Sequence, residues 1–296
     1  MVKEKINELV AKYGSPLYVF QKEEFVKNYL HFEKCFKNLY PKYQLAYSYK
    51  TNYTPVICEI VKQLGGYAEV VSDMEYNVAK RLGYDNEKII YNGPYKTELS
   101  IEHLLAGGIL NIDNIEEVKK VCAVAEAHTE KQLKVGIRVN INIGQCFISR
   151  FGIDSDNSDL DLAFYLLKES GVKVEGLHCH IGQSRTIQAW KNRAEVMLTL
   201  ADKYFPAEPP KYLNLGSGMF AVMKPSLAEQ FGDNIPSFEQ YAAAVAIPFA
   251  EHYASLPEEK KPILFTEPGT TIVNSYIDFV GRVDSIKRIK GQDIVL

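Results

Sequence analysis

A lysine at the end of an apolar run is the residue in this sequence best suited to covalent chemistry. Lys50 closes the run that begins at Gln44, and a helical pattern begins at Thr54. Burying an ammonium group costs several kcal/mol unless its charge is neutralised. Lys50 is therefore interpreted either as an amine that forms a Schiff base or as a strand-end lysine whose charge reaches solvent.

The later apolar runs also end in groups that could do chemistry. Each has an ordinary interpretation by itself, such as a hydrogen-bonded core histidine, a plain glycine turn or a carboxylate that caps a turn. His178 and His180 share one strand face, as metal ligands would, but no cluster of cysteines or carboxylates completes a site, so we expect no metal. In chain order the groups are Arg138, His178, His180, Gly216-Ser217-Gly218 and Glu267-Pro268-Gly269-Thr270-Thr271.

Together these residues meet the requirements of pyridoxal 5′-phosphate. The cofactor needs a lysine for its Schiff base, a flat group to lie on its ring, a carboxylate for its ring nitrogen and a nest for its phosphate. Lys50, His180 and Glu267 supply the first three. The glycine-containing loops 216–218 and 269–271 supply backbone amides, and barrel phosphate sites commonly use the loops after strands seven and eight.

Alternating strands and helices predict how these residues are positioned. Apolar runs typical of buried strands cover residues 44–50, 67–71, 89–93, 109–113, 134–140, 174–181, 212–218 and 263–269. Helical patterns lie between them near 54–65, 72–83, 97–107, 114–129, 160–171, 186–205 and 237–255. This alternation favours a closed (β/α)8 TIM barrel, whose functional groups sit at the carboxyl ends of its strands. A doubly wound open sheet is the rival, but its GxGxxG fingerprint is absent after the first strand.

The two ends of the chain do not follow this alternation. Further expected elements are a helix over 1–14, a strand over 15–20, a helix over 22–39 and strands over 272–277 and 279–286. We therefore expect residues 24–270 to form the cofactor-binding barrel. Residues 1–23 and 271–296 are expected to be partial segments of a second, β-rich domain.

Composition limits the possible functions. The chain has 296 residues, of which 46% are hydrophobic, and this is enough for one large core. Its net charge of -3 gives no electrostatic case for binding nucleic acid, and no apolar run approaches the length of a membrane span. The five cysteines are scattered, without a CxxC pair, so a disulfide framework is not expected and a reducing cytoplasm is the default compartment.

The motifs, taken in chain order, resemble those of the fold-type III pyridoxal-phosphate decarboxylases, which have the alanine racemase-like barrel. They are most similar to the motifs of the diaminopimelate decarboxylases. The ordered set is specific, although each motif by itself is not. It consists of Ser15-Pro16-Leu17-Tyr18-Val19, Tyr49-Lys50-Thr51-Asn52, Glu69-Val70-Val71-Ser72, Arg138-Val139-Asn140, Arg150-Phe151-Gly152-Ile153, His178 to Gln183, Gly216 to Gly218 and Glu267-Pro268-Gly269.

The resemblance implies a role for each residue. Lys50 would carry the cofactor as a Schiff base, with His180 against the ring and Arg138 supporting His180. Glu267 would bond the pyridine nitrogen. The implied activity is decarboxylation of diaminopimelate or a related amino acid by a homodimer, with Lys50 and His180 catalytic. The residues around the phosphate would be Gly216, Ser217, Gly218, Gly269 and Thr270.

The sequence departs from the family pattern in several places. Thr270 stands where an arginine usually follows Glu-Pro-Gly, Ser217 replaces the middle glycine of the phosphate loop, and Gln183 replaces a serine. None of the cysteines lies in the Cys-Glu-Ser-x-Asp motif of the family's β domain. Two alternatives to a decarboxylase are therefore open. One is a cofactor-binding barrel without full turnover, whether the chain is truncated or natural, and the other is an amino-acid racemase. A racemase would need a second base, usually a tyrosine of the β domain.

Overall fold

A closed barrel of eight parallel strands forms the centre of the molecule. The computed structural model describes residues 3–144, 149–232 and 235–296. Pairing of β5 with β6 closes the ring, and the short strand β7 (Ile153–Asp154) is added outside β6. The expected (β/α)8 barrel is thereby confirmed. Its strands are β2 (Tyr43–Ser48), β3 (Tyr67–Val70), β4 (Ile89–Tyr91), β5 (Ile109–Ile112), β6 (Lys134–Asn140), β8 (Lys173–His178), β9 (Tyr212–Asn214) and β10 (Ile263–Thr266).

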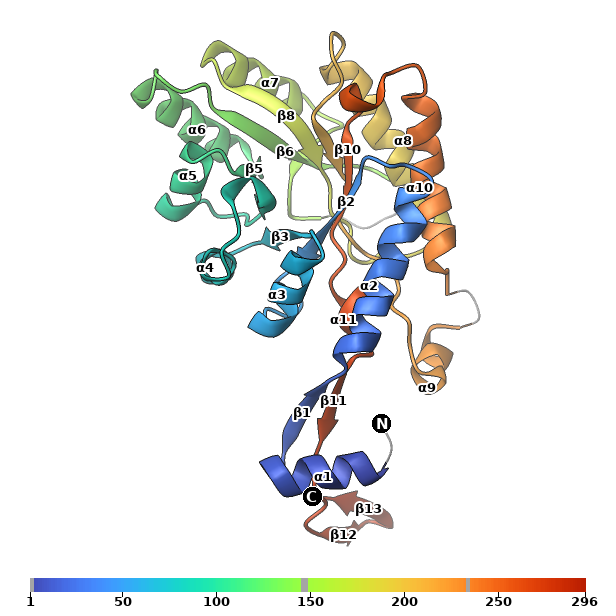
Figure 1. The fold of residues 1–296 in the computed structure, drawn as a ribbon. Helices are drawn as coiled ribbons and strands as arrows, with labels where there is room; N and C mark the ends of the chain where they lie inside the picture. Colours follow the sequence, from blue (N-terminus) through green and yellow to red (C-terminus); the bar gives the residue numbers. More distant parts are fainter. Residues whose placement is uncertain (1–2, 145–148, 233–234) are drawn as a thin grey trace.

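Helices surround the barrel, as Figure 1 shows. Ser72 and Asn114 accept hydrogen bonds from the backbone three residues later, and so begin α4 and α6 as their sequences predict. The long helices are α2 (Lys22–Lys37), α3 (Pro55–Gln63), α4 (Asp73–Arg81), α5 (Glu98–Leu105), α6 (Ile115–Ala127), α7 (Asp159–Glu169), α8 (Ile187–Tyr204) and α10 (Phe238–His252). Shorter ones are α9 (Pro225–Ala228), η1 (Asn86–Lys88), η2 (Glu229–Phe231) and η3 (Glu258–Lys260). No helix in the described ranges has the length and apolar character to cross a membrane.

Aromatic residues of α2 form much of the core between the helices and the sheet. Phe25, Tyr29, Phe32 and Phe36 recur at helical spacing and are all fully buried. The Phe36 ring stacks on Tyr43 of β2, with ring centroids 4.6 Å apart and an interplanar angle of 17°. The stripe that the sequence shows on this helix therefore anchors it against the strand that carries Lys50 at its end.

The chain ends meet below the barrel. α1 (Lys3–Tyr13) precedes β1 (Leu17–Phe20), which pairs in antiparallel fashion with β11 (Ile277–Val280). A hairpin of β12 (Ile286–Ile289) and β13 (Gln292–Val295) follows, and Figure 1 shows these elements lying apart from the barrel. Residues at the beginning and the end of the sequence thus form one small β structure.

The expected strands at 272–277 and 279–286 are wrong in position. The chain forms the short helix α11 (Thr270–Val273) there, and the strands occupy 277–280 and 286–289 instead. The β-branched run of α11 suits a strand locally, but Thr271, Ile272 and Val273 are buried and the helix packs against α2. Asn28 of α2 donates a hydrogen bond to the Ile272 carbonyl at 3.1 Å, and this tertiary contact outweighs the β propensity.

Stability should fall with acid because His103 is buried in a neutral form. Its Nε2 lies 3.2 Å from the carbonyl oxygens of Ile89 and Ile109, and burial lowers its pKa to about 4. In the unfolded chain His103 becomes protonated near pH 6.5, whereas in the folded chain it becomes protonated only near pH 4. The stability present above pH 6.5 should therefore decline by about 3 kcal/mol as pH falls to 4.

Denaturant unfolding at several pH values measures this effect. His103→Gln should flatten the slope between pH 6.5 and 5, whereas His128→Gln, at a half-exposed histidine, should leave it unchanged. Equal slopes in the wild type and in His103→Gln would show that other groups cause the acid sensitivity.

Candidate active site

The carboxyl ends of neighbouring strands bring the predicted residues to one pocket. Lys50 follows β2, His180 follows β8 and Glu267 follows β10, and β10 pairs with both β2 and β9. These side chains line a pocket of about 250 Å³. Of the predicted site residues, the pocket contains Lys50, His180, Ser217, Gly218, Glu267, Gly269 and Thr270, whereas Gly216 and Arg138 lie outside its lining.

The Glu267 carboxylate is the most heavily bonded group at the site. Its Oε1 accepts hydrogen bonds from Nδ2 of Asn92 at 2.6 Å and from Nδ2 of Asn214 at 2.7 Å. Its Oε2 lies 3.3 Å from Nε2 of His178 and 3.7 Å from Nδ1 of His180. Four side chains from three strand ends therefore converge on one fully buried carboxylate.

These partners keep Glu267 charged despite its burial. Burial alone would raise the pKa of Glu267, but the charge and hydrogen bond of His178 and the charge of Lys50 outweigh it. The result is a pKa well below the usual range. Glu267 is therefore a permanent anion that can accept a further hydrogen bond at the pocket wall.

The Lys50 amine is fixed by a second buried carboxylate. Its Nζ lies 2.6 Å from Oε2 of Glu69, which also accepts the Ser48 hydroxyl at 2.5 Å. Glu69 is fully buried, while the Lys50 side chain is 36% exposed. Asn92 Nδ2 donates to both Glu69 and Glu267, at 3.2 Å and 2.6 Å. The amine thus reaches the pocket and still has a fixed counter-charge behind it.

His180 is held as a neutral ring. Burial lowers the pKa of His180 and the Lys50 charge adds to this effect, while Glu267 opposes it. The Ser217 backbone N–H lies 3.3 Å from His180 Nδ1, and this bond requires Nδ1 to be the acceptor. The hydrogen bond fixes the position of the imidazole relative to the glycine loop after β9.

The loops around the pocket suit an anion such as phosphate. Gly216 and Gly218 have φ angles of +64° and +108°, and a Cβ at either would collide with the loop that follows β8. The backbone amides of Gly218 and Thr270 find no acceptor among the described residues. Open amides beside the hydroxyl-bearing residues Ser217 and Thr270 form the donor set that a phosphate group needs. The residues present therefore fit pyridoxal 5′-phosphate.

Arg138 lies away from the pocket. It forms an ion pair with Asp113 at 3.5 Å, and its guanidinium carbon lies 4.7 Å from the centre of the Phe151 ring. The resemblance implies that Arg138 supports His180, but among the described residues no hydrogen bond or ion pair connects the two side chains.

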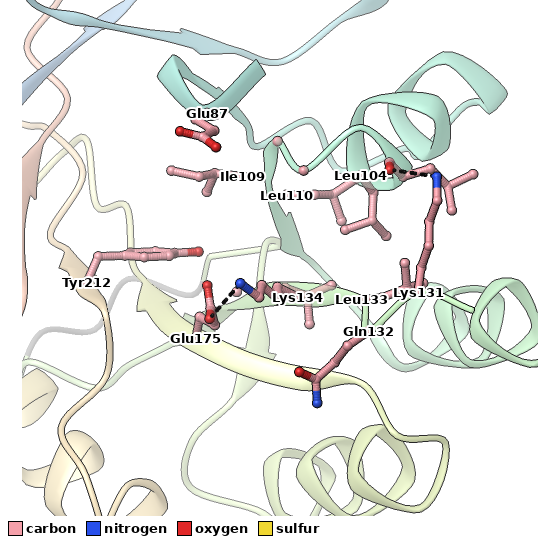
Figure 2. Close-up of a pocket in the computed structure, with 15 residues that line it drawn as sticks. Glu87, Leu104, Ile109, Leu110, Lys131, Gln132, Leu133, Lys134, Glu175 and Tyr212 are labelled. Atoms are coloured by element: carbon pink, nitrogen blue, oxygen red, sulfur yellow. Dashed lines mark hydrogen bonds and ion pairs between the residues drawn. The ribbon is translucent and has the colours of Figure 1, made fainter. Parts of the chain in front are cut away.

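A second pocket lies at the opposite end of the barrel. It has a volume of about 490 Å³, and Figure 2 shows Tyr212 and the Lys134–Glu175 pair, 3.7 Å apart, beside it. Its residues come from the starts of β5, β6 and β9, where barrel residues serve stability more than catalysis. It brings no lysine, imidazole and carboxylate together, so it is not the candidate site despite its size.

Several residues that build the site have no role that the sequence alone predicts. Asn92 and Asn214 lie at the ends of apolar runs, and this position is the feature of the sequence that could have identified them as site residues. Glu69 was visible only as part of a motif. Arg193 lies within a helix, and nothing local distinguished it from a surface arginine.

Arg193 fixes the two loops that border the pocket. It is fully buried, and Nη1 donates to the carbonyls of Leu215 and Ser217 at 2.8 Å while Nη2 donates to the carbonyl of Ile181 at 2.9 Å. Its guanidinium lies 4.0 Å from the centre of the Trp190 ring. Burial lowers the pKa of Arg193 to about 10, so it remains a cation at neutral pH. The carbonyls of these two loops are therefore directed toward the Arg193 guanidinium.

Replacing Arg193 should damage both the fold and the pocket. Arg193→Met leaves three loop carbonyls, two of them in buried contacts, without their donor, at a cost of roughly 3 kcal/mol or more in unfolding free energy. It should also weaken binding of pyridoxal 5′-phosphate at least tenfold. Chemical denaturation and cofactor titration measure the two effects. Lys191→Met, on the exposed face of the same helix, is the control, and equal behaviour of the two variants would refute this role.

Known proteins share this sequence and fold. The family model described as "Pyridoxal-dependent decarboxylase, pyridoxal binding domain" matches residues 23–274. The diaminopimelate decarboxylase of Aquifex aeolicus is 26% identical, over 95% of this chain and 66% of the relative. The diaminopimelate decarboxylase of Neisseria meningitidis serogroup B is 27% identical, over 97% of this chain and 68% of the relative. The chain thus spans about two thirds of the length of the curated relatives it matches.

Solved structures agree with these similarities. The diaminopimelate decarboxylase of M. jannaschii in complex with L-lysine superimposes with a TM-score of 0.83 at 26% identity, over 98% of this chain and 69% of that one. A lysine/ornithine decarboxylase from Vibrio vulnificus shares the fold, with a TM-score of 0.77 at 19% identity. The match covers 99% of this chain and 73% of the Vibrio chain. Because the family model covers most of the chain, this protein belongs to the pyridoxal-dependent decarboxylases and carries their pyridoxal binding domain.

Proposed function

We propose that this chain acts in the decarboxylation of an amino acid, diaminopimelate or a related one, with pyridoxal 5′-phosphate attached at Lys50. The observation that carries the proposal is the convergence of Lys50, His180 and Glu267 on one pocket. Relatives named diaminopimelate decarboxylase, and a solved relative in complex with L-lysine, support this substrate class.

The residues of the pocket would hold the cofactor by different contacts. Lys50 would attach it covalently through Nζ, and Glu267 would accept a hydrogen bond from its ring nitrogen. His180 would lie against the ring, and Arg138 would act on the site only indirectly. When bound, the cofactor withdraws electrons from the carbon that loses carbon dioxide. The residues placed around its phosphate are Gly216, Ser217, Gly218, Gly269 and Thr270.

Proton transfer in the pocket would depend on Lys50. Glu69 holds the amine at 2.6 Å and so keeps its proton-carrying atom at the pocket wall. Glu267 does not compete as an acid because its pKa lies far below neutrality. His180 is neutral for the reason given above. Once a substrate amine has replaced it on the cofactor, Lys50 would therefore be the group in position to donate a proton to a reacting carbon.

The wider organisation follows the same proposal. Residues 24–270 would be the cofactor-binding barrel, and residues 1–23 and 271–296 would belong to a β domain, as the pairing of β1 with β11 supports. Exposed apolar residues on these strands, such as Tyr18, Phe279 and Ile286, are consistent with further chain or a second subunit covering them in a homodimer. The cytoplasmic location expected from the cysteine pattern stays a prediction.

Release of carbon dioxide tests the activity directly. Purified protein supplied with pyridoxal 5′-phosphate should release carbon dioxide from diaminopimelate, lysine or ornithine, with one acid clearly preferred. Visible absorption of bound cofactor without release from any acid would leave a cofactor-binding barrel without turnover. Conversion of one enantiomer to the other without gas release would favour the racemase.

Loss of the lysine amine tests the attachment site. Lys50→Ala should abolish both the visible absorption of the bound cofactor and the covalent label left by borohydride reduction, because no other amine would replace Nζ. Spectroscopy and peptide mapping measure the two effects. Lys27→Ala, an exposed and remote substitution, should retain both. Retention of the label in Lys50→Ala would place the attachment elsewhere.

Thr270 offers a test of the phosphate loops. Thr270→Arg adds a cation at a residue that lines the pocket, so it should tighten binding of the cofactor or of an acidic substrate about tenfold, or roughly 1.4 kcal/mol. Equilibrium titration measures both affinities. Thr270→Val, which removes only the hydroxyl, should weaken cofactor binding. If both affinities are unchanged in Thr270→Arg, the residue does not face the bound ligands.

A further inference from the structure

Three potential metal ligands meet on the outer surface of the barrel, away from the pocket. His31 and Cys35 lie one turn apart on α2, and Glu239 lies in the first turn of α10. His31 Nε2 is 3.2 Å from Oε1 of Glu239, and Cys35 Sγ is 3.7 Å from the same oxygen. One ligand atom from each residue lies within 4.8 Å of the other two.

The donor types and spacing match those of a zinc site. Zn²⁺ is bound at about 2.0–2.3 Å by imidazole nitrogen, thiolate sulfur and carboxylate oxygen, in tetrahedral geometry. Ligand atoms in such a site are separated by roughly 3.3–3.6 Å, which follows from these bond lengths. The two distances to the Glu239 oxygen lie close to that range. His31 approaches Cys35 Sγ through its other ring nitrogen, Nδ1, at 4.0 Å, so the imidazole must rotate for one nitrogen to join both partners around one ion.

The backbone under this cluster is well fixed. His31 and Cys35 are separated by four residues on α2, so their side chains project from the same face. The start of α10 is set by a capping box between Ser237 and Gln240, which holds the turn that carries Glu239. The His31 ring packs on Phe238, with ring centroids 5.7 Å apart. Figure 1 shows α2 and α10 side by side.

Access and charge also favour a cation. The side chains of His31 and Glu239 are more than half exposed, so an ion can enter from solvent. Within the described ranges, the only ion-pair partner of Glu239 is His31, and no lysine or arginine neutralises its carboxylate. The Cys35 thiol donates a hydrogen bond to this carboxylate, so a sulfur ligand and a carboxylate face one point.

We propose that His31, Cys35 and Glu239 bind one divalent cation of the zinc class, with water as the fourth ligand. The ion would join α2, which precedes the first barrel strand, to α10, which precedes the last. Cys35 and Glu239 are 204 residues apart in the chain, so the ion would close a long loop and stabilise the closed barrel. This site is independent of the cofactor pocket.

Cobalt titration tests the site, since Co²⁺ occupies zinc sites and absorbs in the near ultraviolet when a thiolate binds it. The chelator-treated protein should develop this band, reach saturation at one Co²⁺ per chain, and lose the band on addition of Zn²⁺. Cys35→Ser should abolish the band. His31→Ala and Glu239→Gln should each weaken metal affinity at least tenfold. Cys122→Ser, at another partly buried cysteine, is the matched control and should retain the band.

Thermal unfolding supplies a second measurement. Zn²⁺ should raise the midpoint of the wild type and of Cys122→Ser, and should have no such effect on Cys35→Ser or His31→Ala. The absence of a thiolate band in the wild type, or its persistence in Cys35→Ser, would overturn the proposal. An equal zinc-induced shift in all variants would also overturn it, because the ion would then bind elsewhere.

Discussion

The buried carboxylate of Glu267 is the group on which the rest of the site depends. An ionised carboxylate inside a protein costs several kcal/mol unless hydrogen bonds and charges compensate it. The compensation comes from Asn92 after β4, His178 at the end of β8 and Asn214 at the end of β9. An open sheet would not bring those strand ends together around β10. Closure of the barrel is thus a condition for keeping this anion at the pocket.

The hydrogen bonds around Glu267 continue across the barrel in both directions. On one side, Asn92 also donates to Glu69, which holds the Lys50 amine. On the other, the Asn92 side-chain oxygen accepts from Asn111, whose own oxygen accepts the Tyr212 hydroxyl at 2.7 Å. Tyr212 borders the pocket at the opposite end of the barrel. A hydrogen-bond network in the barrel interior therefore connects the end that bears the Lys50 amine with the opposite end of the barrel. The side chains of this network fix one another's positions.

Sequence reasoning was most successful where local pattern decides structure. The eight barrel strands, their helices and the caps at Ser72 and Asn114 were predictable because apolar periodicity and capping are properties of neighbouring residues. The segment after Gly269 was not, since its β-branched residues favour a strand locally but are packed as helix α11 against α2. The role of Arg193 could not be predicted either, because its partners are backbone carbonyls of two distant loops.

The sequence by itself determined the fold class, the family and the supply of reactive groups at the strand ends, because each is written in residue types and short spacings. Only the tertiary structure decided which groups meet. It joined Asn92 to Glu267, 175 residues away, placed Arg138 against Asp113 instead of beside His180, and set Glu239 next to Cys35. Such pairings depend on strand register and helix packing around a closed barrel, and these arise from contacts that no local window of sequence contains.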